Sequence, residues 1–148
     1  PPLFSSRRRH TRWNCSSRGL GDVYKRQGWT LLLTGELGAG KSTFARAFIK
    51  AAGHEGAVPS PTYTLVEPYD LPRGNIYHVD LYRVSSEDEL RYLGWNELEN
   101  GCRLVEWPDR APGLMSQADL SVILSYEGSG RSVEVTALSP RARNVSVK

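Results

Sequence analysis

Apolar residues occur in short runs that alternate with glycine-rich turns and with segments of helical spacing. The run Trp29–Thr34 leads into a glycine-rich turn, which is typical of a buried strand in a parallel sheet. A helix is predicted over residues 42–52, because Phe44 and Phe48 lie four residues apart on one face and Gly53 follows as a stop signal. The pattern therefore begins with a strand-loop-helix unit.

Further elements follow along the chain. Strands are predicted at Tyr63–Tyr69, Ile76–Tyr82 and Cys102–Glu106, and a hairpin at Leu120–Tyr126 and Val133–Leu138 across the turn 127–130. Ser86 with Glu89 three residues later predicts a capping box before a helix, and a short helix is expected over residues 95–99. This succession predicts an α/β domain whose mainly parallel sheet is flanked by helices and ends in a C-terminal antiparallel hairpin.

Length and composition limit the class of protein. A chain of 148 residues with 39% hydrophobic residues is sufficient for one globular domain. No apolar run approaches the ~20 residues that a membrane helix needs, so no membrane partner is expected. The two cysteines, Cys15 and Cys102, are too few for a disulfide framework and favour a reducing compartment, which predicts a cytoplasmic protein.

The positive charge is concentrated at the N-terminus. Residues 1–27 hold seven of the 19 Lys and Arg residues and one of the 16 acidic residues, so this segment carries +6 and residues 28–148 carry −3. A transit peptide or a basic RNA-binding arm would explain such a segment. It also resembles translated sequencing-adapter sequence, and we interpret it as a non-native or disordered tail that precedes an ATPase domain at residues 28–148.

The strongest motif lies directly after the first predicted strand. Residues 35–42, GELGAGKS, match the phosphate-binding pattern G-x-x-x-x-G-K-[ST] at every fixed position. Glycines at 35, 38 and 40 allow the backbone to turn its N–H groups towards a polyphosphate, and the helix that follows presents its positive end. Lys41 is expected to reach the β- and γ-phosphates of ATP and the Ser42 hydroxyl to bind Mg²⁺. A glycine-rich turn without function is the alternative, but the strand-loop-helix context argues against it.

A nucleotide site of this kind also needs a carboxylate at a neighbouring strand end. Glu106 and Asp80 each end a predicted strand, and the alternative for each is an ordinary solvated acid at a strand end. Glu106 is preferred as the Mg²⁺ ligand because the run before it is more apolar and thus more central. Asp80 would then orient the attacking water or support the metal indirectly.

Three other side chains near these motifs can be interpreted as structural or as functional. Thr62, in the polar loop 60–64, would sense the γ-phosphate if the loop were a switch, but spacing alone favours an ordinary loop. His78 is interpreted as an ordinary strand histidine. Trp107 belongs to the core or, if it is partly exposed, provides a stacking surface beside the site.

Four motifs in order, GELGAGKST, SPTYTLVEPY, YHVDLYR and LVEWPDR, resemble the TsaE (YjeE) family of bacterial ATPases. The resemblance extends from about residue 28 to residue 138. It implies a small P-loop NTPase fold that binds ATP with Mg²⁺, hydrolyses it slowly alone, and acts with TsaD and TsaB partners. Their product is N6-threonylcarbamoyladenosine at position 37 of tRNAs that read ANN codons, so tRNA is contacted through the complex.

The resemblance also implies roles for individual residues. Gly38, Ala39, Gly40, Lys41, Ser42 and Thr43 would hold the phosphates, Ser42 and Glu106 would bind Mg²⁺, Asp80 and Trp107 would act in turnover, Thr62 would lie in a switch-like loop, and Arg131 would lie near the nucleotide. Family members begin with a strand and a helix that contribute to adenine contacts. Residues 1–27 do not match these elements, so we expect this strand and helix to be missing.

Two other functions fit a phosphate-binding loop. A small kinase for a metabolite would need an acceptor pocket and usually a lid with arginines, whereas the arginines here are scattered among acidic residues. A nucleotide-gated binding module would need no useful turnover. An ATPase that acts in tRNA modification remains the preferred hypothesis.

Overall fold

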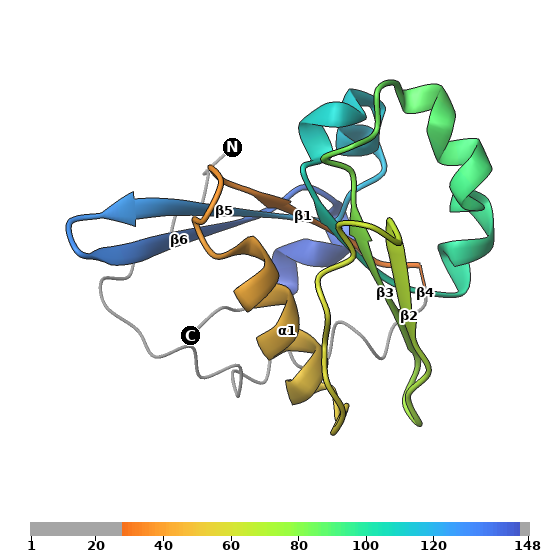
Figure 1. Cartoon of the computed structure of the whole chain (residues 1–148), viewed down its shortest axis with the longest axis horizontal. Coiled ribbons are helices and arrows are strands. Elements are labelled where there is room, and N and C mark those ends of the chain that lie inside the picture. Colours follow the sequence, from red (N-terminus) through yellow and green to blue (C-terminus); the bar gives the residue numbers. More distant parts are fainter. Residues whose placement is uncertain (1–27, 146–148) are drawn as a thin grey trace.

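The computed structural model describes residues 28–145, so the predicted tail at residues 1–27 lies outside the described residues. The described chain forms one six-stranded sheet with helical segments on both faces (Figure 1). Its strands are β1 Thr30–Thr34, β2 Val66–Tyr69, β3 Asn75–Asp80, β4 Gly101–Glu106, β5 Leu120–Glu127 and β6 Gly130–Ala137.

The sheet is mixed and mostly parallel. Its strand order is β2-β3-β4-β1-β5-β6, and the central pairs β3–β4, β4–β1 and β1–β5 are parallel. Both edges are antiparallel, with β2 paired to β3 and β6 paired to β5. The expected parallel sheet and C-terminal hairpin are thus confirmed, and β2 adds a second antiparallel edge.

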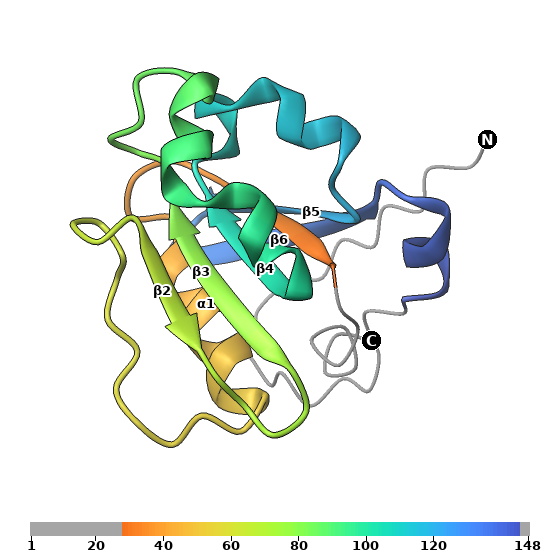
Figure 2. The ribbon, with the colours of Figure 1, turned by 90° about the vertical axis from the view of Figure 1, so that its right-hand side faces the viewer.

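Each face of the sheet packs against its own cluster of core residues. The single α-helix of the described chain, α1 Lys41–Ala51, packs with Phe44 and Phe48 on one face. The opposite face is covered by 3₁₀ segments, which lie above the sheet in Figure 1 and are separated from α1 by the strands in Figure 2. These segments are η2 Glu87–Leu93, η3 Trp95–Asn100, η4 Pro108–Arg110 and η5 Pro112–Ser116. A further 3₁₀ segment, η6 Pro140–Asn144, contributes Ala142 to the core on the α1 side.

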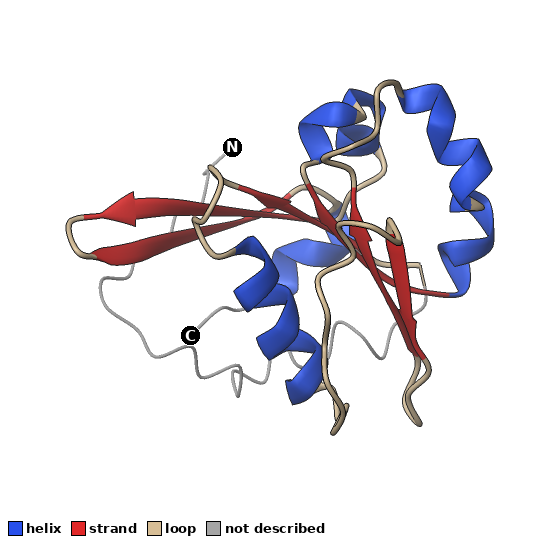
Figure 3. Ribbon diagram, in the orientation of Figure 1, coloured by secondary structure: helices blue, strands red, loops and turns tan. Residues whose placement is uncertain are grey.

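Some local expectations are wrong in detail. The helices expected after Ser86 and over residues 95–99 are 3₁₀ segments rather than α-helices (Figure 3). No capping box forms, because the Glu89 carboxylate accepts a hydrogen bond from the backbone N–H of Ser85 and the Ser86 side chain makes no cap hydrogen bond. A glutamate that bonds one residue earlier satisfies a backbone donor outside the helix instead. No helix in the described part of the chain is long and apolar enough to span a bilayer.

The strands differ from prediction mainly at their ends. β2 begins at Val66 rather than at Tyr63, because residues 61–64 form turns and Leu65 adopts a left-handed conformation with φ 65°. β3 ends at Asp80, so the following Leu81 and Tyr82 already belong to a turn. The carboxylates of Asp80 and Glu106 are placed side by side, because these residues are register partners at the ends of two parallel strands.

Candidate nucleotide-binding site

The loop 35–40 joins β1 to α1 and depends on glycine at two positions for different reasons. A Cβ at Gly35 would lie 2.5 Å from the carbonyl oxygen of Leu124 on β5, so no other residue fits without moving the backbone. Gly38 has a φ of 76°, a region that residues with a Cβ rarely adopt. The loop is therefore held close against the sheet and bent, as the motif requires.

The remaining motif residues complete the turn into the helix. Gly40, with φ 107°, is the N-cap of α1, and its carbonyl accepts the N–H of Phe44 at 2.9 Å. Ala39 is buried, and its N–H donates to the carbonyl of Glu36 at 3.0 Å. Thr43 is exposed in the first turn of α1. One of the loop amides is thus used inside the loop itself rather than facing outward.

The C-terminal hairpin contacts the loop from the side. The Tyr126 hydroxyl donates a hydrogen bond of 2.9 Å to the carbonyl of Leu37. Arg131, the register partner of Tyr126, places its guanidinium 4.0 Å from the Tyr126 ring centre and 3.5 Å from the carbonyl oxygen of Gly38. Arg131 therefore lies at the phosphate-binding loop, where it packs on Tyr126.

Lys41 is buried beneath an aromatic ring at the start of α1. Its Nζ donates to the carbonyls of Gly35 at 2.6 Å and Glu36 at 2.9 Å, and it lies 3.8 Å from the centre of the Trp107 ring. Burial lowers the pKa of the Lys41 ammonium from its ordinary value, while nearby carboxylates, Glu106 first among them, act in the opposite direction. The ammonium is thus placed at the loop that the motif assigns to phosphate.

Trp107 adopts an unusual backbone conformation to cover this position. It is partly exposed and follows the end of β4 with a φ of 58°, a left-handed value that is uncommon for a residue with a bulky side chain. Its ring also packs against Tyr82, with ring centres 4.9 Å apart. Trp107 is therefore a stacking surface beside the loop, with one face against the Lys41 ammonium.

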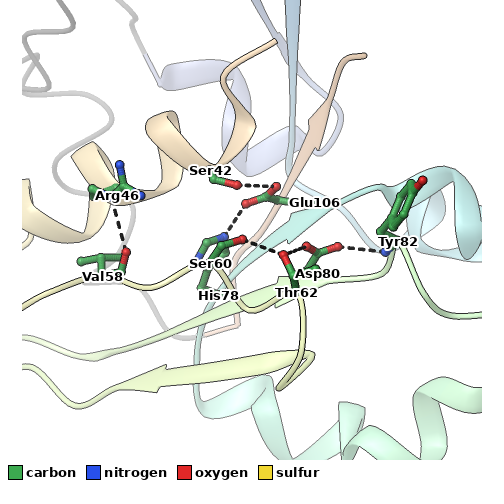
Figure 4. A network of polar contacts seen from close by, with 9 residues as sticks. All are labelled: Ser42, Arg46, Val58, Ser60, Thr62, His78, Asp80, Tyr82 and Glu106. Atoms are coloured by element: carbon green, nitrogen blue, oxygen red, sulfur yellow. Dashed lines mark hydrogen bonds and ion pairs between the residues drawn. The ribbon is translucent and has the colours of Figure 1, made fainter. Parts of the chain in front are cut away.

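Ser42 and Glu106 meet at the carboxyl end of the sheet. The Ser42 hydroxyl donates to Glu106 Oε2 at 3.1 Å, and His78 Nε2 lies 2.6 Å from Glu106 Oε1 (Figure 4). Glu106 is 2% exposed, and a buried carboxylate needs hydrogen-bond partners such as these. The hydroxyl and carboxylate expected to bind Mg²⁺ are thus brought together from α1 and β4.

Asp80 lies on the neighbouring strand and is held by the adjoining loops. Its Oδ1 accepts the N–H of Tyr82 at 2.9 Å, and its Oδ2 is 3.4 Å from the Thr62 hydroxyl (Figure 4). Thr62 also lies 3.0 Å from the Ser60 hydroxyl. The loop that contains Thr62 therefore touches the site through Asp80 rather than through the phosphate-binding loop.

The oxygens at this place fit a magnesium ion that arrives with a nucleotide. Mg²⁺ prefers oxygen ligands and is usually held by one or two carboxylates together with substrate phosphates. The Ser42 hydroxyl and the Glu106 carboxylate are 3.1 Å apart and provide such oxygens. Within residues 28–145 no group of three or more His, Cys, Asp or Glu side chains is placed to hold a metal without further ligands.

Sequence reasoning missed two contributors to this site, His78 and Tyr126. The sequence pattern favours an ordinary strand histidine at this position, yet His78 is 1% exposed and directly contacts Glu106. A signal was present, since His78 precedes Asp80 by two residues and so lies on the same face of β3. Tyr126 had no comparable signal, because its contact with Leu37 depends on where the hairpin folds.

Comparisons with known proteins agree on one family. A family model described as "Threonylcarbamoyl adenosine biosynthesis protein TsaE" matches residues 13–133. The chain is 39% identical over 115 residues to the tRNA threonylcarbamoyladenosine biosynthesis protein TsaE of Haemophilus influenzae, covering 76% of this chain and 73% of that protein. The protein of the same name from Bacillus subtilis is 35% identical over 123 residues, or 80% of this chain and 76% of that one. A crystal structure of Bacillus subtilis YdiB matches with a TM-score of 0.71 and 25% identity, over 97% of this chain and 91% of that chain.

Proposed function

The chain belongs to the TsaE family, and from this premise we propose that it binds and hydrolyses ATP with Mg²⁺ as a component of the machinery that forms N6-threonylcarbamoyladenosine in tRNA. In this proposal, the modified nucleoside is at position 37 of tRNAs that read ANN codons. The chain is expected to hydrolyse ATP slowly alone and to act through its partner proteins.

One observation carries the nucleotide part of the proposal. The glycine loop, the buried Lys41 ammonium and the Ser42–Glu106 pair converge at the carboxyl end of β1 and β4. In parallel α/β sheets, ligands bind at the carboxyl ends of the strands. The arrangement supplies a cation for phosphate and two oxygen ligands for a metal in the same place.

The residues suggest a division of tasks in phosphoryl transfer, in which positioning and charge stabilisation do most of the work. Ser42 and Glu106 would hold Mg²⁺, and the bound ion would supply charge neutralisation at the phosphates. Lys41 is expected to release its loop carbonyls and bind phosphate oxygens instead. Asp80, fixed by the Tyr82 N–H, is available to orient the attacking water. Trp107 excludes water from the Lys41 side.

Contact with tRNA is proposed to be indirect, through TsaD-type and TsaB-type proteins. The described residues belong to the segment that carries −3, whereas non-specific nucleic-acid binding depends on clustered positive charge. The domain thus offers little positive charge for the tRNA backbone. Direct tRNA binding that persists after deletion of residues 1–27 would contradict this part of the proposal.

The proposal is tested by following ATP in single turnovers with and without the TsaB–TsaD pair and tRNA. Free phosphate and modified tRNA should both increase when the partners are present. Glu106→Gln should abolish this increase, whereas Glu55→Gln, at an exposed position outside the site, should not change it. No stimulation by the partners and no effect on the tRNA product would contradict the proposed role.

The same assay separates the ATPase from a kinase. ATP is incubated with the chain and a panel of small acceptors, and the products are separated. Free phosphate should form without a phosphorylated acceptor. A phosphorylated acceptor that forms faster than free phosphate would show that the site transfers the phosphoryl group to a metabolite.

A further inference from the structure

We propose that His78 is a positioning residue that holds the Glu106 carboxylate in the orientation that binds Mg²⁺. This inference rests on the proposed nucleotide-binding function. It concerns a residue that neither the phosphate-binding motif nor the pattern of acidic residues identified. The single contact that carries it is the hydrogen bond of 2.6 Å between His78 Nε2 and Glu106 Oε1.

The contact assigns a separate partner to each oxygen of the carboxylate. Glu106 Oε1 accepts from His78, whereas Oε2 faces the Ser42 hydroxyl at 3.1 Å (Figure 4). A carboxylate can rotate about its last bond and exchange its two oxygens. The bond to the histidine opposes this rotation, so Oε2 stays on the side of α1 and of the phosphate-binding loop.

The sheet makes this contact possible through its register. His78 pairs with Leu104, and Asp80 pairs with Glu106, across the parallel strands β3 and β4. Because side chains alternate along a strand, the side chains at 78 and 80 project on one face, together with those at 104 and 106. That face is the one covered by α1, since Leu104 shares its core cluster with Phe44.

Packing alone does not explain why a polar side chain occupies this buried position. The imidazole is 1% exposed, yet its Nδ1 has no hydrogen-bond partner, so the ring is anchored by Nε2 alone. An apolar side chain would fill the same space without leaving a buried nitrogen unpaired. The polar ring is thus explained by its one partner, the Glu106 carboxylate.

Removal of a group that hydrogen-bonds to a metal ligand and orients it typically lowers metal affinity or activity by 10–100-fold. Loss of the His78 N–H should therefore weaken the Mg²⁺-dependent part of nucleotide binding. Binding that does not depend on the metal should change little, since His78 touches neither Lys41 nor the glycine loop in any contact described above. This separation distinguishes a positioning role from a merely structural one.

Glutamine and asparagine form a matched pair of substitutions. The amide nitrogen of glutamine is separated from Cα by the same number of bonds as His Nε2, whereas that of asparagine corresponds to Nδ1, which has no partner here. Both side chains are polar amides. His78→Gln should therefore keep the hydrogen bond to Glu106, and His78→Asn should lose it.

The experiment measures the affinity for the ATP analogue AMP-PNP by calorimetry in EDTA and across a Mg²⁺ series, on full chains whose melting temperatures are also recorded. The Mg²⁺ concentration that gives half of the full increase in AMP-PNP affinity should rise about tenfold or more in His78→Asn. In His78→Gln it should stay within about threefold of the wild-type value. Affinity in EDTA should be the same in all three proteins.

Two results would overturn the inference. Either His78→Asn and His78→Gln have the same Mg²⁺ dependence, or affinity in EDTA falls as much as affinity in Mg²⁺, which indicates a general loss of structure. If wild type itself shows no Mg²⁺-dependent binding of AMP-PNP, the proposed function fails rather than the role of His78. The two failures are therefore distinguishable.

Discussion

Alanine at Gly38 tests whether the C-terminal hairpin stabilises the phosphate-binding loop. Gly38 has a φ of 76°, and a Cβ built there would lie 2.8 Å from the Tyr126 hydroxyl, which donates to the carbonyl of Leu37. The Tyr126 side chain is half-exposed, so its hydroxyl can move aside at a lower cost than the backbone can. The added methyl group is therefore expected to break this hydrogen bond rather than to move the backbone.

The expected loss in the free energy of unfolding of Gly38→Ala is the sum of two costs. A left-handed conformation costs a residue with a Cβ about 1–2 kcal/mol, and the lost hydrogen bond costs about 0.5–1.5 kcal/mol. Gly128 provides the matched control, because its φ is 59° and a Cβ there meets nothing within 4 Å. We expect Gly128→Ala to cost only the first term and Gly38→Ala to cost both, about 1.5–3.5 kcal/mol.

The assay is urea denaturation of a double-mutant cycle with Tyr126→Phe. In the Tyr126→Phe background, Gly38→Ala should cost about as much as Gly128→Ala, because the hydrogen bond is already absent. ATP affinity should fall in Gly38→Ala and remain unchanged in Gly128→Ala. Strict additivity of Gly38→Ala and Tyr126→Phe would refute the proposed contact between hairpin and loop.

Three further substitutions test the account at other points. Gly35→Ala should reduce ATP affinity even if the chain folds, since its Cβ would lie 2.5 Å from a backbone carbonyl oxygen of β5; unchanged affinity in calorimetry would show that the loop has room. Trp107→Leu should lower the free energy of unfolding by about 0.5–2 kcal/mol through loss of the ring over the Lys41 ammonium, as measured in urea, and an equal stability would argue against that contact. Asp119 is buried directly before β5 and accepts two hydrogen bonds from Arg141, at 2.6 and 2.7 Å. Asp119→Asn should lower the free energy of unfolding by about 1.5–3 kcal/mol at neutral pH. Burial alone would raise the pKa of Asp119, but hydrogen bonds, those from Arg141 first, outweigh it and hold this pKa below its ordinary value, so the unfolded chain binds the proton more tightly. The advantage of wild type over Asp119→Asn should thus be complete above about pH 5 and decline as the pH falls below about 4, and an advantage that persists in acid would contradict this.

The presence of most strands along the chain and the position of α1 were predictable because their sequence patterns favour one type of element, whereas the order of the strands in the sheet required the structure. The run Trp29–Thr34 is apolar and ends in glycine, and Phe44 and Phe48 have helical spacing. Secondary structure was less predictable where the chain covers the second face. Segments such as Trp95–Asn100 have apolar residues at intervals that suit an α-helix or a 3₁₀ helix, and packing on the sheet decides between them.

Some residues of the candidate site were likewise predictable from the sequence, and the contacts of others were not. The loop, Lys41, Ser42 and the two strand-end acids could be found by motif and position. Trp107 could be named from its position after Glu106, but its left-handed backbone and its contact with the Lys41 ammonium required the structure. The role of His78 depends on the register of β3 against β4, which a single sequence does not specify.

The central claim, that ATP phosphates bind at Lys41, is tested most directly by calorimetric titration of ATP with Mg²⁺ into wild type, Lys41→Ala and Lys50→Ala. Lys50 provides the control because it is an exposed lysine on the same helix, α1. Wild type and Lys50→Ala should bind ATP with equal affinity, and Lys41→Ala should show no measurable binding. Unchanged affinity in Lys41→Ala, or an equal loss in Lys50→Ala, would contradict the assignment of this loop as the nucleotide site.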